Sequence, residues 1–252
     1  MTVRIAWERH GAGPLLILIQ GIGLARWGFG PSVDLLAERF EVIVYDNRGI
    51  GESDAPPGPY SIPMLAEDAL QVLDEAGASS AHVLGASLGG MVAQQLAVEY
   101  PERVERLVLC CTTPGRSDAF PVPEPTARLL AGAAALDRET AITKFTRNAL
   151  SPGASDELVA QLVRLRLEKP QEAAAWGAQV AAGAGFEGVE LGRTAAPTLV
   201  LYGSEDNVVD IRNSALLAER IPDARSEALD GGHMFWWEAP EEFTRVVGEF
   251  LS

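Results

Sequence analysis

Short apolar runs recur along the chain, and they constrain the fold more than any other feature of the sequence. They lack the alternation of apolar and polar residues that marks a strand with one face in water. Runs of this kind typically form strands that are covered on both faces, as in parallel sheets. The sequence therefore predicts a mostly parallel sheet. Its expected strands are LLILIQ (15–20), EVIVYD (41–46), AHVLGA (81–86), RLVLCC (106–111) and PTLVLY (197–202).

Amphipathic segments lie between these strands. The clearest one, SIPMLAEDALQVLDEAG, places apolar residues on one helical face, with Ser61 as N-cap and Gly77 as the stop. Alternating strands and helices predict an α/β fold, a mostly parallel sheet with helices on both faces. Residues 3–20 differ, because two extended segments flank the turn His10-Gly11-Ala12-Gly13, and we expect an antiparallel hairpin there.

The alternation stops between residues 114 and 194. This region starts with a proline-rich loop, continues with alanine-rich helical segments and contains no convincing strand. We therefore expect a core domain made of residues 1–113 and 195–252, with residues 114–194 inserted as a helical cap. The cap would lie above the carboxyl ends of the strands, where open α/β sheets bind ligands, and would act as a lid. The alternative is a helical layer that only covers apolar surface.

Composition excludes several classes of partner. The chain has 252 residues, of which 47% are hydrophobic, and a formal net charge of −15 without a basic cluster, so nucleic acids and anionic membranes are not expected partners. It has no apolar run of the ~20 residues that span a bilayer and no secretory leader, which predicts a cytoplasmic protein. Cys110 and Cys111 are adjacent in a strand and point to opposite faces, so we expect buried, reduced thiols.

The segment Gly85-Ala86-Ser87-Leu88-Gly89 matches G-x-S-x-G, in which a strand turns sharply into a helix with serine at the apex. Side chains at Gly85 and Gly89 would collide with the serine or a neighbouring strand, and Gly90 allows close helix packing. The motif follows an apolar strand and precedes an apolar-periodic helix, which is the context it requires. We therefore predict that Ser87 is a nucleophile.

A serine hydroxyl needs a base, and histidine is the usual one near neutral pH. His10 lies in the N-terminal turn and His82 begins the strand before Ser87, so both are expected to be structural. His233, in the loop LDGGHMFWWEAP, is the predicted base. The carboxylate that orients it is expected after the strand PTLVLY, at Asp206, with Glu205 as the alternative.

Acyl transfer also needs two backbone N–H groups that stabilise the developing oxyanion. The amide of Leu88 begins the helix after the elbow, where the helix dipole assists. The second donor is expected in Gly21-Ile22-Gly23, after the first long strand, and we assign it to Ile22. The alternative for this loop is a turn that contacts no ligand.

These stretches together resemble the α/β-hydrolase family, in the family's order and over nearly the whole chain: QGIG, YDNRGIGESDAPPGPYS, HVLGASLGGMVAQQLAVEYPERVERLVLCCT, LVLYGSEDNVV and GGHM. Within the family the chain is similar to small-molecule carboxylesterases and 3-oxoadipate enol-lactonases. One departure is Gln20-Gly21, where many relatives carry His-Gly; Gln20 can still hydrogen-bond the loop, so the departure concerns how the loop is anchored and not the chemistry. The resemblance implies that Arg48, in the stretch D-x-R-G-x-G-x-S, is structural.

Serine at the apex favours an acyl-enzyme route on a small, mainly apolar ester or lactone. Cleavage of C–C bonds or thioesters, and a slow-turnover ligand receptor that keeps the triad, stay as alternatives. No metal or cofactor motif is present, because HExxH, paired cysteine ligands and a Walker loop are missing and GIGLAR lacks the last glycine of the dinucleotide fingerprint. The substrate pocket is expected to include Trp27, Phe29, Met91, Phe145, Trp176 and Met234.

Overall fold

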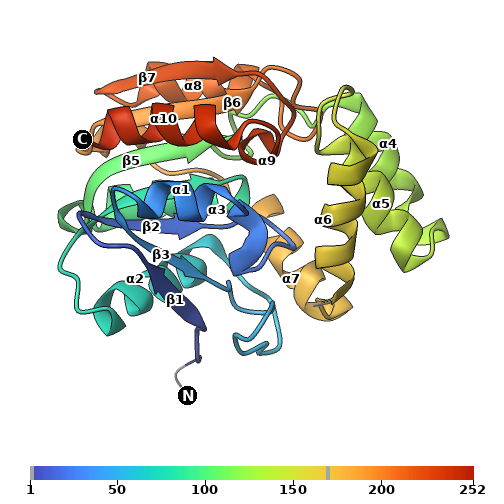
Figure 1. Cartoon of the computed structure of the whole chain (residues 1–252), viewed down its shortest axis with the longest axis horizontal. Helices are drawn as coiled ribbons and strands as arrows, with labels where there is room; N and C mark the ends of the chain where they lie inside the picture. Colours follow the sequence, from blue (N-terminus) through green and yellow to red (C-terminus); the bar gives the residue numbers. More distant parts are fainter. Residues whose placement is uncertain (1–2, 169–170) are drawn as a thin grey trace.

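The computed structural model of the chain describes residues 3–168 and 171–252. Figure 1 shows a central sheet with helices on both sides and a group of further helices at one end of it. The strands pair in the order β1-β3-β2-β4-β5-β6-β7, and every neighbouring pair is parallel except β1 with β3. The strands are β1 (Trp7–His10), β2 (Leu15–Ile19), β3 (Glu41–Tyr45), β4 (Ala81–Ala86), β5 (Val104–Cys110), β6 (Thr198–Gly203) and β7 (Ala224–Leu229).

Successive residues of one strand pack into opposite halves of the core. In β2, Ile17 and Ile19 belong to one apolar cluster and Leu16 and Leu18 to the other. The first cluster contains residues of α2 (Ile62–Glu75), α3 (Leu88–Glu99) and α8 (Arg212–Arg220), and the second contains residues of α1 (Ser32–Ala37), α9 (Phe235–Glu238) and α10 (Pro240–Leu251). The apolar runs of the sequence are thus unbroken because each strand is buried on both faces of the sheet.

The start of the chain corrects one prediction. β1 and β2 do not form a hairpin, because β3 lies between them and β1 pairs antiparallel with β3, with Trp7 opposite Tyr45. β2 has β3 and β4 on its two sides, so neither of its edges is open to β1. β1 pairs instead with the free edge of β3. β1 is mostly solvent-accessible, as suits an edge strand.

The helix expected between residues 61 and 77 is confirmed as α2. The Ser61 side chain accepts a hydrogen bond from the Met64 amide at 3.4 Å, and Gly77 follows the helix with a φ of +76°. A serine N-cap satisfies an amide that has no partner inside the helix. Local sequence therefore determines both ends of this element.

The residues between β5 and β6 form α4 (Glu124–Gly132), α5 (Arg138–Asn148), α6 (Asp156–Glu168) and α7 (Ala173–Ala184), with no strand among the described residues. Figure 1 shows α4, α5 and α6 beside the end of the sheet toward which the arrows of β5, β6 and β7 point. Within the described part of the chain, no helix has the length and apolar character to cross a membrane.

Candidate active site

Ser87 lies between β4 and α3 in a strained backbone conformation, with φ 55° and ψ −118°. A non-glycine residue adopts positive φ at an energetic cost, so neighbouring contacts must hold it. The Ser87 amide donates to the Cys110 carbonyl at 2.9 Å, and the Thr112 hydroxyl donates to the Ser87 carbonyl at 2.7 Å. Two backbone groups of the apex are therefore tied to the end of β5, which leaves the side chain to project from the turn.

The glycines around Ser87 permit close approaches between backbones. A Cβ on Gly89 would lie 2.0 Å from the Ile19 carbonyl oxygen in β2, and one on Gly85 would lie 2.2 Å from the carbonyl oxygen of Gly89. A Cβ on Gly90 would overlap the Thr112 side chain, at 2.5 Å from its Cβ. These contacts bring α3 against the sheet, so the elbow has no room for larger residues.

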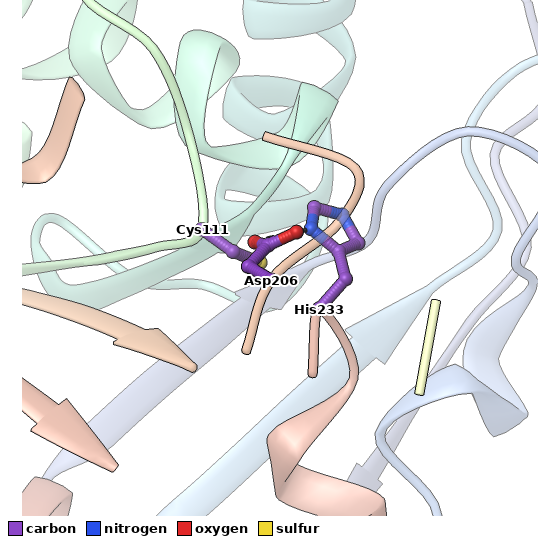
Figure 2. A group of neighbouring side chains, drawn as sticks. All are labelled: Cys111, Asp206 and His233. Atoms are coloured by element: carbon purple, nitrogen blue, oxygen red, sulfur yellow. Dashed lines mark hydrogen bonds and ion pairs between the residues drawn. The ribbon is translucent and has the colours of Figure 1, made fainter. Parts of the chain in front are cut away.

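Asp206 and His233 come from loops after β6 and β7 and form a buried pair. His233 Nδ1 lies 2.8 Å from Asp206 Oδ2, and Asp206 Oδ1 accepts hydrogen bonds from the amides of Val208 and Val209 at 2.7 and 2.9 Å. Figure 2 shows the carboxylate and the imidazole turned toward each other. Glu205, the alternative carboxylate, is exposed. The structure thus places Asp206, and not Glu205, against the imidazole.

The electrostatics of the pair favour a charged imidazole. Burial lowers the pKa of His233, but the Asp206 carboxylate and contact with Cys111 raise it by more, so the pKa lies well above its ordinary 6.5. Because the hydrogen bond uses Nδ1, Nε2 is the ring nitrogen left to act as a base. This arrangement orients the ring and stabilises its protonated form.

The loop that carries His233 is fixed by contacts that the sequence analysis missed. A Cβ on Gly203 would lie 2.0 Å from the Gly232 carbonyl oxygen, so the end of β6 touches the loop after β7. The Glu238 carboxylate accepts from the Gly232 amide at 2.8 Å and also bonds the amide and hydroxyl of Ser151, which precedes α6. The two glycines before His233 indicated a close approach of this loop to a neighbour. The bond between Glu238 and Ser151 could not be seen in the sequence, because the two residues are 87 positions apart.

Cys111 lies beside the Asp206 and His233 pair (Figure 2). Its backbone φ is +43°, and burial raises the pKa of its thiol to about 11, so the thiol stays protonated at neutral pH. Potential ligand atoms of Cys111, Asp206 and His233 lie within 4.8 Å of one another. The nearer oxygen of Asp206 and Nδ1 of His233 already bond each other, however, so this geometry serves a hydrogen-bonded pair better than a metal. Both cysteines are buried free thiols, as predicted.

Ser87 and the imidazole are joined through the end of β5. The Ser87 amide bonds the carbonyl of Cys110, and the next residue, Cys111, contacts His233. Among the described residues, the Ser87 hydroxyl itself makes no hydrogen bond. Hydrogen bonds between nucleophile and base are often long without substrate and tighten when it binds.

The loop after β2 lies against Ser87. A Cβ on Gly21 would be 3.1 Å from the Ser87 Cβ, so this loop and the elbow are in contact. Neither the Ile22 amide nor the Leu88 amide donates to another described residue. The side chains of Ile22 and Leu88 both pack beneath Gly183 of α7. Two unpaired amides beside a candidate nucleophile are suitable donors for an oxyanion.

Gln179 of α7 is a further residue that sequence reasoning missed. Its side chain is fully buried; Oε1 accepts from the Gly23 amide at 3.2 Å and Nε2 donates to the Arg48 carbonyl at 3.0 Å. It therefore connects α7 to the loop that carries Ile22. A single glutamine in an alanine-rich helix gives no local signal for such a contact.

The expected pocket residues occupy different environments. Phe29 is fully buried, 5.5 Å from the ring of Trp236, so the structure places it in the core. Met234 is also buried, whereas Trp27 and Phe145 are partly exposed. Met91 packs near Gly183 beside Leu88, and Trp176, 41% exposed, lies next to Gly23.

The structure also shows the surroundings of the remaining residues that the sequence analysis singled out. His82 is buried at the start of β4, the opposite end of that strand from Ser87, and His10 lies near Glu8 at 3.3 Å. Arg48 forms a two-bond ion pair with Asp68 of α2, both at 2.6 Å. Gln20 corrects an expectation: its side-chain amide has no hydrogen-bond partner among the described residues, whereas its backbone carbonyl oxygen accepts from Asn47 Nδ2 at 3.0 Å. Its side chain is instead packed against Gly28.

Comparison with known proteins agrees with the fold described above. Residues 14–240 match the family described as the alpha/beta hydrolase fold. The pimeloyl-[acyl-carrier protein] methyl ester esterase of Aeromonas hydrophila subsp. hydrophila is 32% identical over 98% of this chain and 99% of that protein. A hydrolase from Pseudomonas aeruginosa PA01 is 32% identical, with a TM-score of 0.87 over 99% of this chain and 95% of the other.

A third similar protein is Est816, whose structure is described as that of an N-acyl homoserine lactone degrading enzyme. It is 29% identical, with a TM-score of 0.82 over 98% of this chain and 97% of the other. The family match covers most of the chain, and the sequence motifs fall within the matched residues, where they follow the ends of strands. The chain therefore belongs to the α/β-hydrolase family.

Proposed function

We propose that this protein is a serine hydrolase that cleaves carboxylic esters or lactones of small, mainly apolar compounds through an acyl-enzyme on Ser87. The observation that carries the proposal is the buried Asp206 and His233 pair, which contacts the β5 end that also holds the strained Ser87. Similarity to a methyl ester esterase and to a lactone-degrading enzyme supports the same substrate class.

In the proposed mechanism, Ser87 Oγ attacks the substrate carbonyl carbon while His233 Nε2 takes the hydroxyl proton. The carbonyl oxygen becomes an oxyanion and receives hydrogen bonds from the amides of Ile22 and Leu88. The imidazolium, stabilised by Asp206, then protonates the departing alcohol oxygen, and an acyl-enzyme results. Water, deprotonated by the same imidazole, hydrolyses it and restores Ser87. With a lactone, the alcohol stays attached to the acyl group.

Residues 114–194 act as a helical cap over this site in the proposal. Support comes from α7, whose Gln179 bonds the loop of the proposed oxyanion donor and whose Gly183 covers Ile22 and Leu88. Gln171, just before α7, donates to the Gly49 carbonyl at 3.0 Å. These contacts hold the second half of the cap on the core at the proposed site.

The test combines labelling and turnover. Wild-type protein and Ser87→Ala are treated with a fluorophosphonate, digested and analysed by mass spectrometry, and then assayed on aryl acetate, butyrate and octanoate and on a lactone panel. We expect stoichiometric label on Ser87 and hydrolysis only by the wild type. Folded wild-type protein that takes up no label and hydrolyses nothing above the Ser87→Ala background would refute the proposal.

A further inference from the structure

The chain leaves α5 through a short buried segment, Asn148–Ser151 (the exit segment). Its last three residues are at most 8% exposed, although the segment connects two helices of the proposed cap. Connections between helices usually run over the surface, because their backbone groups need hydrogen-bond partners. The exit segment has its partners at the core instead, in the loops that carry His233 and Asp206.

The backbone of the exit segment touches the backbone on both sides of His233. The Met234 amide donates to the Ala149 carbonyl at 2.9 Å. On the other side, a Cβ on Gly232 would lie 2.4 Å from the carbonyl carbon of Leu150, so no side chain separates the two backbones. The peptide units that flank the imidazole are therefore in direct contact with the proposed cap.

Glu238 makes a second link between the exit segment and the same loop. Its carboxylate accepts from the Gly232 amide at 2.8 Å, and it also accepts from the Ser151 amide at 3.1 Å and from the Ser151 hydroxyl. One carboxylate thus joins the residue before His233 to the end of the exit segment. Hydrogen bonds to a charged acceptor are stronger than those between neutral groups.

The strands of the core hold this loop only as far as Gly231. The Glu205 amide donates to the Gly231 carbonyl at 2.9 Å. From Gly232 to Met234, within the part of the chain that the structure describes, the bonded backbone amides have their partners in Glu238 and in the exit segment. The position of the imidazole therefore depends on contacts with the segment that follows α5.

A parallel set of bonds reaches the loop of Asp206. The Thr126 hydroxyl, in α4, donates to the Asn207 carbonyl at 2.5 Å and accepts from the Asn148 side-chain amide at 2.6 Å. Thr126 is buried, and Asn207 lies inside the turn that the Asp206 carboxylate closes with two backbone amides. The first residue of the exit segment is thus bonded toward the acid, as its last residue is toward the base.

We infer that Ser151 and Thr126 are positioning residues for the proposed hydrolysis, and that the exit segment aligns the base with the acid through them. Ser151 acts through Glu238 on the loop of the base, and Thr126 acts through the Asn207 carbonyl on the loop of the acid. This inference rests on the function proposed above and adds a role for the first half of the cap. A misplacement of about 1 Å at a reacting group can cost roughly 100-fold in rate, so these bonds bear on kcat and not only on stability.

The test removes each hydroxyl and compares the result with a matched hydroxyl of the same cap. Ser151→Ala is paired with Ser155→Ala, because the Ser155 hydroxyl accepts an amide at the exposed start of α6. Thr126→Val is paired with Thr140→Val, because the Thr140 hydroxyl bonds an acid just before α5. Circular dichroism and thermal unfolding verify folding. Glu238→Gln, which weakens the same link from its other end, replaces Ser151→Ala if that variant does not fold.

We expect Ser151→Ala and Thr126→Val to lose roughly 10- to 100-fold in kcat on an aryl ester. KM should change less, because the acid and base shift while the surface that binds substrate stays. The two controls should keep kcat near that of the wild type even where they lower thermal stability. A variant that matches its control in kcat overturns the assignment of its residue, because the bond would then only hold the cap on the core.

Combination with Asp206→Asn shows whether the effect runs through the acid and base. If Ser151 acts by aligning the ring with its carboxylate, Ser151→Ala should cost much less in Asp206→Asn protein, where that alignment is already lost. Ser155→Ala should have the same small effect in both backgrounds. Equal fold losses for Ser151→Ala in the two backgrounds would overturn its assignment, since independent effects add.

Titration of the histidines by NMR needs no substrate and therefore separates this inference from the proposed function. The titratable groups that face the His233 ring are Asp206 and Cys111 (Figure 2), and together they hold its pKa above 6.5 against burial. Ser151→Ala should lower this pKa, because the carboxylate no longer lies in line with the ring, and should leave the titration of the other two histidines unchanged.

The two measurements together assign a failure to one proposal or the other. A lowered His233 pKa in Ser151→Ala, without hydrolysis of any ester by the wild type, would support the positioning role and refute the serine hydrolase alone. Hydrolysis by Ser151→Ala at the wild-type kcat, with an unmoved titration, would refute the positioning role alone.

Discussion

Asp206 Oδ2 lies 2.8 Å from His233 Nδ1, and the other oxygen of the carboxylate is held by two backbone amides. Asparagine in place of Asp206 would present an N–H or a neutral oxygen to the ring and would no longer fix its tautomer. We expect Asp206→Asn to lower kcat by roughly 10³- to 10⁴-fold with a small change in KM, as for other triads. Steady-state kinetics on an aryl ester measure this.

The matched control is Glu205→Gln, which removes the adjacent but exposed carboxylate. It should retain nearly full activity. If Glu205→Gln loses as much activity as Asp206→Asn, then the orienting acid has been assigned to the wrong residue.

The raised pKa of His233 predicts a pH dependence. The base must be neutral to accept a proton, so kcat/KM should increase with pH, with a midpoint above 6.5. In Asp206→Asn the carboxylate that raises the pKa is gone while burial still lowers it, so the midpoint should move down. Measurements of kcat/KM between pH 5 and 9 for both proteins test the direction, and an unchanged midpoint would contradict it.

The same pKa shift has a consequence for stability. A group whose pKa is raised by folding stabilises the fold below its unfolded pKa, near 6.5, and this contribution disappears as pH rises through the folded pKa. Asp206→Asn should therefore lose more unfolding free energy at pH 5.5 than at pH 9. Urea unfolding at the two pH values gives the comparison, and an equal loss at both would mean that the pair is not charged at low pH.

Residues whose roles follow from local pattern could be predicted from sequence. The doubly covered strands and α2 were predicted because burial and capping leave a pattern within a few residues. Ser87, Asp206 and His233 could be chosen as candidates because each follows a strand end, and the ends of parallel strands meet at one edge of the sheet.

Features that depend on pairing across the chain could not be predicted. The hairpin prediction was wrong because strand order depends on which edge of β3 is free. The sequence of residues 3–20 contains no information about that edge. The contact between the Phe29 ring and Trp236, more than 200 residues later, was not predicted either, because Phe29 was considered only for its place after the proposed oxyanion loop. Gln179 gave no signal, because a helix pattern does not identify the partners that its polar residues meet.

Gln179 provides a test of how the cap positions the site. Gln179→Met would leave the Gly23 amide and the Arg48 carbonyl without their buried partner, which loosens the loop that carries the Ile22 amide. We expect kcat to fall about tenfold or more with KM less affected, because the oxyanion forms after binding. Gln179→Glu keeps the acceptor for Gly23 but places a carboxylate oxygen against the Arg48 carbonyl oxygen, so it should lose activity as well. Loss of thermal stability without loss of kcat would show that the contact only holds the cap in place.

The Arg48 and Asp68 pair should contribute to stability and not to chemistry. Both side chains are buried and joined by two bonds of 2.6 Å. Asp68→Ala leaves a buried guanidinium without its partner, so we expect a loss of about 3–5 kcal/mol in unfolding free energy. Glu249→Ala, which breaks the exposed pair with Arg245, is the control and should leave the urea midpoint unchanged. Similar losses for both would mean that burial does not distinguish the two pairs.

Two helix glycines should respond oppositely to alanine. In α3, a Cβ on Gly89 would lie 2.0 Å from the Ile19 carbonyl oxygen, and backbone cannot move aside as a side chain does. Gly89→Ala should therefore destabilise the protein by about 1–3 kcal/mol and reduce labelling of Ser87, because α3 would separate from β2. In α7, nothing lies within 4 Å of a Cβ on Gly177, so Gly177→Ala should stabilise by up to about 1 kcal/mol through helix propensity. Urea unfolding measures both changes. A Gly89→Ala protein that is stable and fully labelled would contradict the contact between the elbow and β2. Gly177→Ala is the control, because it measures how much alanine stabilises a helix when no contact is disturbed.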